Sequence, residues 1–150
     1  MRHRKSGRKL NMSPSHRKAL VRSLVTALFL HGRIRTSLAR AKEIRPLADR
    51  MVSLGKAGSL SARRMALQTI YEKSVVKKLF DEIAPQFRDR AGGYTRIIKI
   101  DWRTGDHAPM SLLELTQGGG EVKAQTRKKK RKDRSAEEKK GGGAEAKPSS

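Results

Sequence analysis

Apolar residues between positions 13 and 83 recur every three or four residues, the spacing of helices that pack one face on a core. The first helix is predicted to begin at Ser13 and Pro14, because a serine side chain caps free N–H groups and proline has none to leave unpaired. Gly32 is placed to end this helix. Its apolar stripe consists of Leu20, Val21, Leu24, Val25, Ala27 and Leu28.

A short strand is predicted at residues 34–36, followed by a second helix that Ser37 can cap. Pro46 lies inside this helix and should bend it or split it, because proline removes a hydrogen bond and clashes with the preceding turn. The expected buried stripe contains Leu38, Ala41, Leu47, Ala48, Met51 and Leu54.

Two shorter helices are predicted next. One starts near Ser59 or Ser61 and runs to Ile70, and the other covers residues 74–83 and ends before Pro85.

The hydrophobic period then changes to that of strands. Residues 94–100 are rich in β-branched and aromatic side chains, residues 110–115 form a second such run, and Thr104 to Asp106 reads as a turn between them. With residues 34–36 as a third strand, the pattern predicts an α+β fold, in which several helices pack on one face of a small mixed β-sheet.

Composition divides the chain into three zones: a basic arm at residues 1–12, a globular domain at 13–117, and a low-complexity tail at 118–150. The tail has Val122 as its only large apolar residue, so it cannot bury enough surface to offset the entropy of ordering. We therefore expect the tail, and the arm in the absence of a partner, to be disordered.

The charge balance indicates a polyanionic partner. The chain has 36 Lys and Arg against 14 Asp and Glu, a formal charge of +22 and a pI near 11.3. The tail holds 11 basic and 5 acidic residues, net +6, and the rest holds 25 and 9, net +16, so the globular part is basic in its own right. Nucleic acid fits best, because membrane-surface helices need more aromatic residues than the 4% found here.

The sequence favours no membrane span and no export signal. No apolar run approaches the roughly 20 residues that cross a bilayer, and an organellar transit peptide is disfavoured because the Ser13–Pro14 break leaves no helical face in the arm. We expect a cytoplasmic protein. The absence of cysteine excludes disulfides and thiolate metal sites.

The strongest local signal is the first 42 residues, which contain twelve Lys or Arg and no carboxylate. Like charges at this density repel one another unless a partner such as phosphate neutralises them. The alternative is that the segment is only a solvated end of the chain. A second candidate is the glycine element at residues 90–96. There Gly92 and Gly93 permit close backbone approach to a phosphate while Tyr94 stacks or packs; the alternative is a tight loop with Tyr94 in the core.

Evidence for catalysis is weak. The four histidines lack metal-ligand spacing, and the chain has no nucleotide-binding glycine motif. An acid–base set for cleaving phosphodiesters could be formed by Asp101, Asp106 and His107. This set lies at a turn flanked by Gly105 and Pro109, however, where polar residues are expected anyway. No enzyme activity, cofactor, metal site or small-molecule substrate is predicted.

Four motifs in order resemble the seventeenth protein of the bacterial large ribosomal subunit. They are the opening Met1 to Asn11, Ser15-His16-Arg17, the Ile34-to-Ser37 step with Ala39 to Glu43, and Arg90-Ala91-Gly92-Gly93-Tyr94-Thr95-Arg96. The resemblance runs from Met1 to about Gln117. It implies a non-catalytic α+β protein that binds large-subunit ribosomal RNA near the polypeptide exit, meets neighbouring ribosomal proteins and supports assembly and translation. Members of that family often end near Leu115 or Thr116, so the tail inherits no role.

The predicted RNA-contact residues combine the matched motifs with the basic residues beside them. They are Arg2, His3, Arg4, Lys5, Arg8, Lys9, His16, Arg17, Lys18, Arg35, Arg40, Lys42, Arg90, Gly92, Gly93, Tyr94 and Arg96. Two other hypotheses remain open on the sequence, a DNA-compacting protein and an RNA-processing enzyme.

Overall fold

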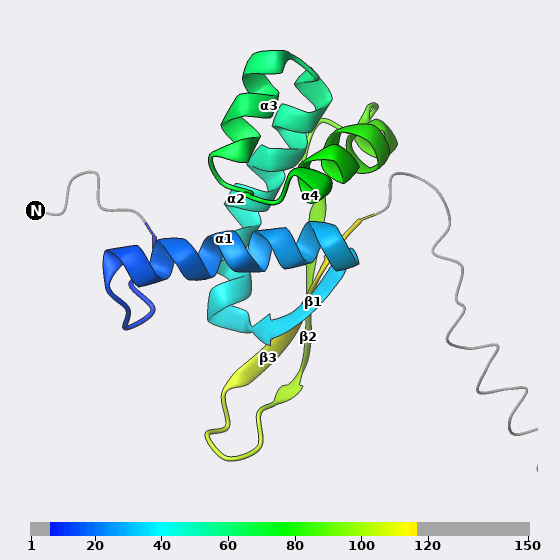
Figure 1. Ribbon diagram of the computed structural model, residues 1–150. Coiled ribbons are helices and arrows are strands. Elements are labelled where there is room, and N and C mark those ends of the chain that lie inside the picture. The colour runs from blue at the N-terminus through cyan, green and yellow to red at the C-terminus, as the bar shows by residue number, and fades with distance from the viewer. Residues whose placement is uncertain (1–6, 117–150) are drawn as a thin grey trace, which may run out of the picture. The chain divides into compact units, whose positions relative to one another are not determined.

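The computed structural model describes residues 7–116, which form an α+β unit of helices packed on a three-stranded sheet (Figure 1). The expected fold class is confirmed. In chain order the elements are α1 (Pro14–His31), β1 (Arg33–Ser37), α2 (Leu38–Ala57), α3 (Leu60–Leu67), α4 (Lys73–Lys78), a π-helical turn η1 (Leu79–Ile83), a 3-10 turn η2 (Ala84–Phe87), β2 (Thr95–Trp102) and β3 (Pro109–Leu115).

The first helix begins and ends at the predicted residues. The Ser13 hydroxyl oxygen accepts from the His16 backbone N–H at 3.4 Å, and Pro14 occupies the first turn. Gly32 adopts a left-handed conformation with φ +75°, and its N–H donates to the Leu28 carbonyl at 2.7 Å. A side chain at Gly32 would be strained in that conformation, so glycine suits the end of the helix.

The sheet has the order β1-β3-β2, and β3 pairs antiparallel with both neighbours. The expectation of a mixed sheet is therefore corrected to a fully antiparallel one. The reason is that β2 and β3 are joined by a short hairpin, while β1 enters from α1 in the direction opposite to β3. Ile34, Leu113 and Ile97 share one row across the three strands and face the core.

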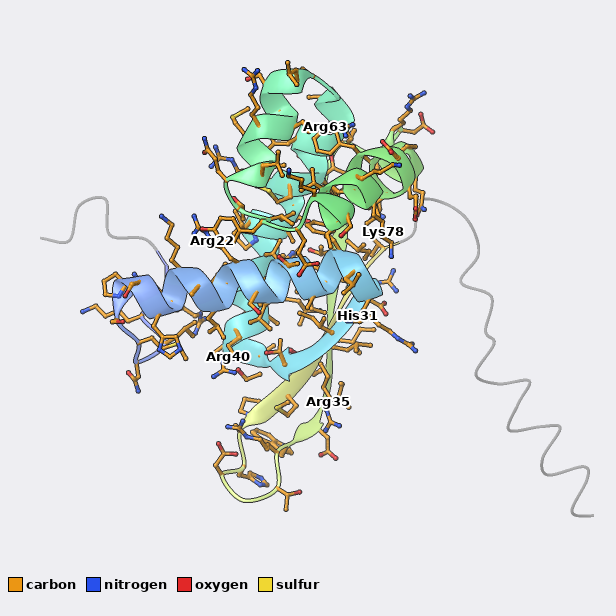
Figure 2. The ribbon with its side chains drawn as sticks, viewed as in Figure 1. Arg22, His31, Arg35, Arg40, Arg63 and Lys78 are labelled. Atoms are coloured by element: carbon orange, nitrogen blue, oxygen red, sulfur yellow. The ribbon has the colours of Figure 1, made fainter. Side chains whose placement is uncertain are left out.

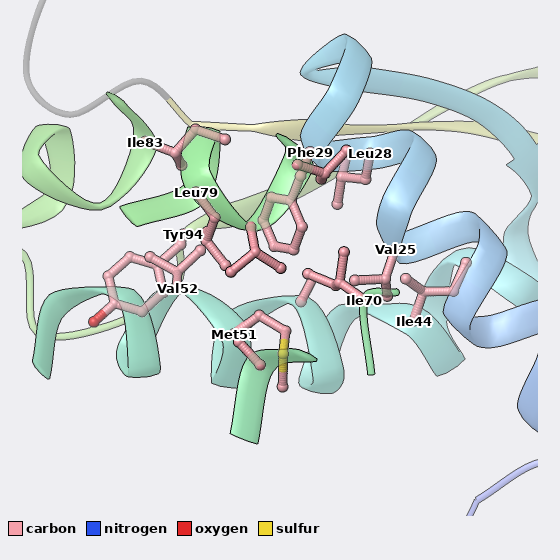
Figure 3. Close-up of a cluster of buried hydrophobic side chains, with 14 of the residues drawn as sticks. Val25, Leu28, Phe29, Ile44, Met51, Val52, Ile70, Leu79, Ile83 and Tyr94 are labelled. Atoms are coloured by element: carbon pink, nitrogen blue, oxygen red, sulfur yellow. The ribbon is translucent and has the colours of Figure 1, made fainter. Parts of the chain in front are cut away.

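Helix α2 packs against all three strands and also against α1, α3 and the η turns. Because it has neighbours on two sides, its buried face is wider than one stripe. Ile44 and Val52 are fully buried although neither was in the predicted stripe. Phe29 of α1 was missed in the same way, and Figure 3 shows it in one cluster with Val52 and Leu79.

The two predictions involving proline have different outcomes. Of the two effects expected of Pro46, a bend or a split, the split does not occur: helix α2 runs unbroken through this residue, which is exposed, so that water can reach the carbonyl group that proline leaves without a partner. The fourth helical segment does not end before Pro85. The segment changes from α to π geometry at Leu79 and then to the 3-10 turn Ala84–Phe87. Pro85 fits the first turn of a helix, because a backbone N–H at that position would have no hydrogen-bond partner within the helix.

One face of the sheet is not covered by helices. Arg35, Leu112 and Ile98 form a row on this outer face, and Ile98 and Ile100 are 40% and 49% exposed. The hairpin tip extends past the helices (Figure 1).

Candidate nucleic-acid interface

The predicted contact residues of the arm fall partly outside the described residues. The contact residues outside this range are Arg2, His3, Arg4 and Lys5, and the tail at residues 118–150 lies outside it as well. Arg8 and Lys9 are described and exposed.

Glu43, at the start of α2, holds the described part of the arm. Its carboxylate accepts a hydrogen bond from the Arg8 backbone N–H at 2.9 Å. Gly7 has φ +89°, and a Cβ placed on it would lie 2.8 Å from a Glu43 carboxylate oxygen. The contact therefore favours glycine at position 7 because of its backbone conformation, and a Cβ there would also force the Glu43 carboxylate to shift. Since Glu43 binds backbone rather than a side chain here, the Arg8 side chain remains exposed.

The N-terminal basic cluster gathers where α1 and α2 begin. We define it as Arg8, Lys9, His16, Arg17, Lys18, Arg40 and Lys42. Arg17 and Lys18 line a groove of about 430 Å³ together with Glu43. Arg40 lies one turn before Glu43 on α2, so the structure brings together residues from three segments: the arm, α1 and α2.

The glycine element is a preorganised loop in which Tyr94 belongs to the core. The ring is 3% exposed and packs edge to face on Phe87, with centroids 5.3 Å apart. Its hydroxyl donates to the carbonyls of Arg90 and Ala91 at 3.2 and 3.3 Å. Of the two alternatives for Tyr94, the structure shows the packed one. A buried ring has no free face for a base, so Tyr94 serves the element by holding its backbone.

Lys56 and Arg90 tie this loop to the rest of the fold. The Lys56 ammonium donates to the Arg90 carbonyl at 2.6 Å and lies 5.4 Å from the centroid of the Tyr94 ring. The Arg90 guanidinium donates to the carbonyl of Gly92 and the hydroxyl of Thr116, both at 3.1 Å. These bonds fix the loop between the end of α2 and the end of β3.

The two glycines leave an open approach to the backbone of the glycine element. Gly93 has φ +66°, which favours glycine, and a Cβ at either Gly92 or Gly93 would meet nothing within 4 Å. The space beside this backbone is therefore free for a phosphate or another polar group.

Arg35 lies apart from both groups on the outer face of the sheet, and Arg96, the last residue of the glycine element, lies on the same face. They belong to the two edge strands, on either side of β3. Arg96 pairs with Glu114 directly across the strands, at 3.8 Å. Figure 2 shows Arg35 and Arg40 on the side of α1 toward the strands, and Arg22 and Lys78 on the side toward α3 and α4.

The N-terminal basic cluster and the glycine element lie at opposite ends of α2. Glu43 contacts the arm and Lys56 contacts the glycine element, and thirteen residues of helix span about 20 Å at a rise of about 1.5 Å per residue. One phosphate cannot reach both. A polyanion that contacts both must extend along α2 or present two separate segments.

The polar residues of the hairpin tip form a structural cluster. Arg103 donates to both carboxylate oxygens of Asp106, at 2.8 and 2.5 Å, and this hydrogen bonding lowers the pKa of Asp106 to about 2. His107 stacks on Trp102, with centroids 4.8 Å apart and an angle of 5° between the rings. A carboxylate with so low a pKa is a weak general base, which argues against the acid–base set considered from the sequence.

Sequence reasoning assigned no role to Glu43, although it ends one of the matched motifs, or to Lys56, because each acts across 34 or 35 residues of chain. Glu43 did carry one signal, as the first carboxylate after a long cationic segment. Among residues 7–116 no helix is long and apolar enough to cross a membrane.

Comparisons with known proteins agree with the resemblance seen in the sequence. The family model described as "Ribosomal protein L17" matches residues 20–116. The "Large ribosomal subunit protein bL17" of Pelobacter propionicus is 56% identical over 117 residues, which cover 78% of this chain and 92% of that protein. Proteins of the same name are 54% identical in Desulfotalea psychrophila, over 84% of this chain and 98% of the relative, and 52% identical in Thermus thermophilus, over 78% of this chain and 100% of the relative. These matches confirm the resemblance, and the chain belongs to the ribosomal protein L17 family, whose members are structural proteins and not enzymes.

Proposed function

We propose that this chain is a structural constituent of the large ribosomal subunit that binds large-subunit ribosomal RNA near the polypeptide exit and supports assembly and translation. The relatives named above are large-subunit proteins. The place near the exit and the part in assembly follow from the family resemblance, as do neighbouring ribosomal proteins as partners and a cytoplasmic location on the ribosome.

The observation that carries the RNA contact is the N-terminal basic cluster. Residues 7–42 contain nine Lys or Arg and no carboxylate, and the fold gathers most of them where α1 and α2 begin. Glu43, the first carboxylate, accepts from the Arg8 backbone, and no ion pair between Glu43 and a cationic side chain is found within residues 7–116. Uncompensated charge of this density favours phosphates, whose binding releases counterions.

The glycine element supplies a second contact region in this proposal. Its backbone is held by Tyr94, Lys56 and Arg90 before any partner arrives, so binding there loses little conformational entropy. Because the two regions are about 20 Å apart along α2, we expect two separate footprints on the RNA rather than one.

The direct test compares partners. The full chain is titrated with large-subunit ribosomal RNA and with duplex DNA of equal length in moderate salt. Preferential binding to the RNA is expected, whereas equal affinity would support the DNA-compacting hypothesis and contradict the proposal.

The arm is tested by deleting residues 1–9, which removes five Lys or Arg. Binding should weaken and the dependence of affinity on salt should flatten, by about 0.7–0.9 in logarithmic slope for each phosphate that the shortened chain no longer neutralises. The matched control replaces the five basic residues 128–132 of the tail with Gln. If both variants weaken binding equally, the arm contributes only net charge and makes no specific contact.

A further inference from the structure

An open groove of about 650 Å³ lies between α1 and the segment that joins α3 to α4. Lys18, Arg22 and Leu30 line it from α1, and Tyr71 and Glu72 line it from the segment before α4. Its volume is in the range of sites that hold small organic groups. None of the predicted contact residues except Lys18 belongs to it.

Tyr71 is an exposed aromatic ring held in a fixed place. Tyr71 is 69% exposed, so most of its surface is open to a binding partner. The Arg22 guanidinium lies over it, 4.9 Å from the ring centroid, and also donates to the Tyr71 hydroxyl. A further Arg22 nitrogen donates to the Gln68 carbonyl at 3.0 Å, so Arg22 is itself anchored. Much of the ring remains open to solvent in an orientation that is already set.

The charge around the groove selects its occupant. Lys18 and Arg22 are the cations that line it, and Glu72 is the one carboxylate among its lining residues. A partner must therefore combine a flat apolar surface for the ring with negative charge for the cations. An unpaired nucleotide has both, because every base offers a π face and its phosphate is anionic.

We propose that this groove, the Tyr71 groove, receives one unpaired nucleotide of the RNA, with its base stacked on Tyr71 and its phosphate beside Lys18. The inference rests on the proposed function, since it assumes that the partner is RNA. It adds a contact that only an unpaired base can make, whereas the N-terminal basic cluster contacts phosphates of single-stranded or double-stranded RNA alike. Because each base has a π face, the site selects an unstacked base rather than a particular sequence.

The test measures binding of full-length variants to large-subunit ribosomal RNA. Tyr71→Ala should weaken binding by about tenfold, as expected for the loss of one base–aromatic stack, and Tyr71→Phe and Tyr71→Trp should retain most of the affinity. Tyr71→Leu keeps apolar bulk without the aromatic face and should resemble Tyr71→Ala. The matched control is Leu60→Ala on α3, which removes a side chain that is also largely exposed, at 66%, and should leave binding unchanged.

Two further readouts separate stacking from charge. Tyr71→Ala should leave the salt dependence of binding unaltered, because the cations that meet phosphates are all still present. Chemical probing of the bound RNA should show one unpaired base that is protected by the wild-type chain and reactive with Tyr71→Ala.

Unchanged affinity and an unchanged probing pattern with Tyr71→Ala would overturn the inference, even if the wild-type chain binds RNA as proposed. Crosslinking from position 71 to a protein rather than to RNA in assembled subunits would also overturn it. If the wild-type chain shows no preference for ribosomal RNA, the proposed function fails first, and that result is visible before any variant is tested.

Discussion

Glu43 illustrates how one side chain positions a charged segment. The arm carries too few apolar groups to fold on itself, yet the Glu43 carboxylate binds the Arg8 backbone and turns the chain toward α2. Tyr94 acts similarly at the other end of α2, where its buried ring and hydroxyl hold the loop that displays Gly92 and Gly93. In both places polar contacts to backbone groups hold the chain and leave the candidate binding groups exposed.

The hydroxyl of Tyr94 is tested by Tyr94→Phe. The change removes the donor to the Arg90 and Ala91 carbonyls and should lower the free energy of unfolding by about 0.5–1.5 kcal/mol. Urea denaturation measures this free energy of unfolding. Tyr71→Phe is the control and should cost less than about 0.5 kcal/mol, because the Tyr71 side chain is exposed. Equal costs for the two variants would mean that the Tyr94 hydroxyl does not stabilise the loop.

Gly55 is tested by Gly55→Ala, which adds a Cβ only 2.8 Å from the Cβ of Ala84. Alanine usually stabilises a helix relative to glycine by about 1 kcal/mol, but here overpacking should destabilise the fold by about 1–3 kcal/mol. The measurement is thermal or urea unfolding, with the exposed neighbour Ser53→Ala as control. Adding Ala84→Gly should restore part of the loss. A stabilised Gly55→Ala variant would refute the close approach of α2 to the η2 turn.

Element by element, sequence prediction succeeded where a local signal existed. Ser13, Pro14 and Gly32 bound α1 as expected, Ser59 caps α3, and the three strands form one sheet. Boundaries failed in the fourth helical segment, because its π and 3-10 turns depend on packing against α2 and carry no signature in the local sequence. Buried residues such as Ile44 were missed because a single stripe was assumed for a helix with neighbours on two sides.

The β2–β3 hairpin should respond to acid at its tip. The pKa of Asp106 is lowered to about 2 by Arg103, below its usual value of about 3.9. A carboxylate with a depressed pKa stabilises the folded state above the unfolded pKa, and this contribution is lost as the pH falls through the folded pKa. The order of the tip should therefore decrease between about pH 4 and pH 2.

Trp102, the only tryptophan in the chain, reports this change through its fluorescence. Asp106→Asn should remove the change between about pH 4 and pH 2, and Asp101→Asn, the matched control, should retain it. A transition of the same size in the Asp106→Asn chain would show that the Arg103–Asp106 pair does not order the tip.

At the scale of the whole molecule, sequence alone predicted the class of fold, the polyanionic partner and the family. The individual contacts were harder, because they depend on residues far apart in the chain. Arg22 and Tyr71 are separated by 49 positions, and the two ends of α2 became distinct regions only once the fold was known. The arm and the glycine element were predicted as contact regions from their motifs, whereas the residues that line the Tyr71 groove carry no motif.

Truncation after Gln117 tests how far the arm and the globular domain act without the tail. It removes a net charge of +6 and leaves +16, so binding to ribosomal RNA should weaken modestly and remain selective over DNA. Titration of the truncated chain with both nucleic acids measures the selectivity. If the truncated chain loses its preference for RNA, the tail rather than the globular part carries the recognition.

The most direct test of the central claim is sucrose-gradient fractionation of a lysate from cells that contain this chain, with mass spectrometry of each fraction. A structural constituent of the large subunit should remain at about one copy per particle after a high-salt wash. Its release into the free or DNA-bound fractions under the same wash would show a general polyanion binder and contradict the account.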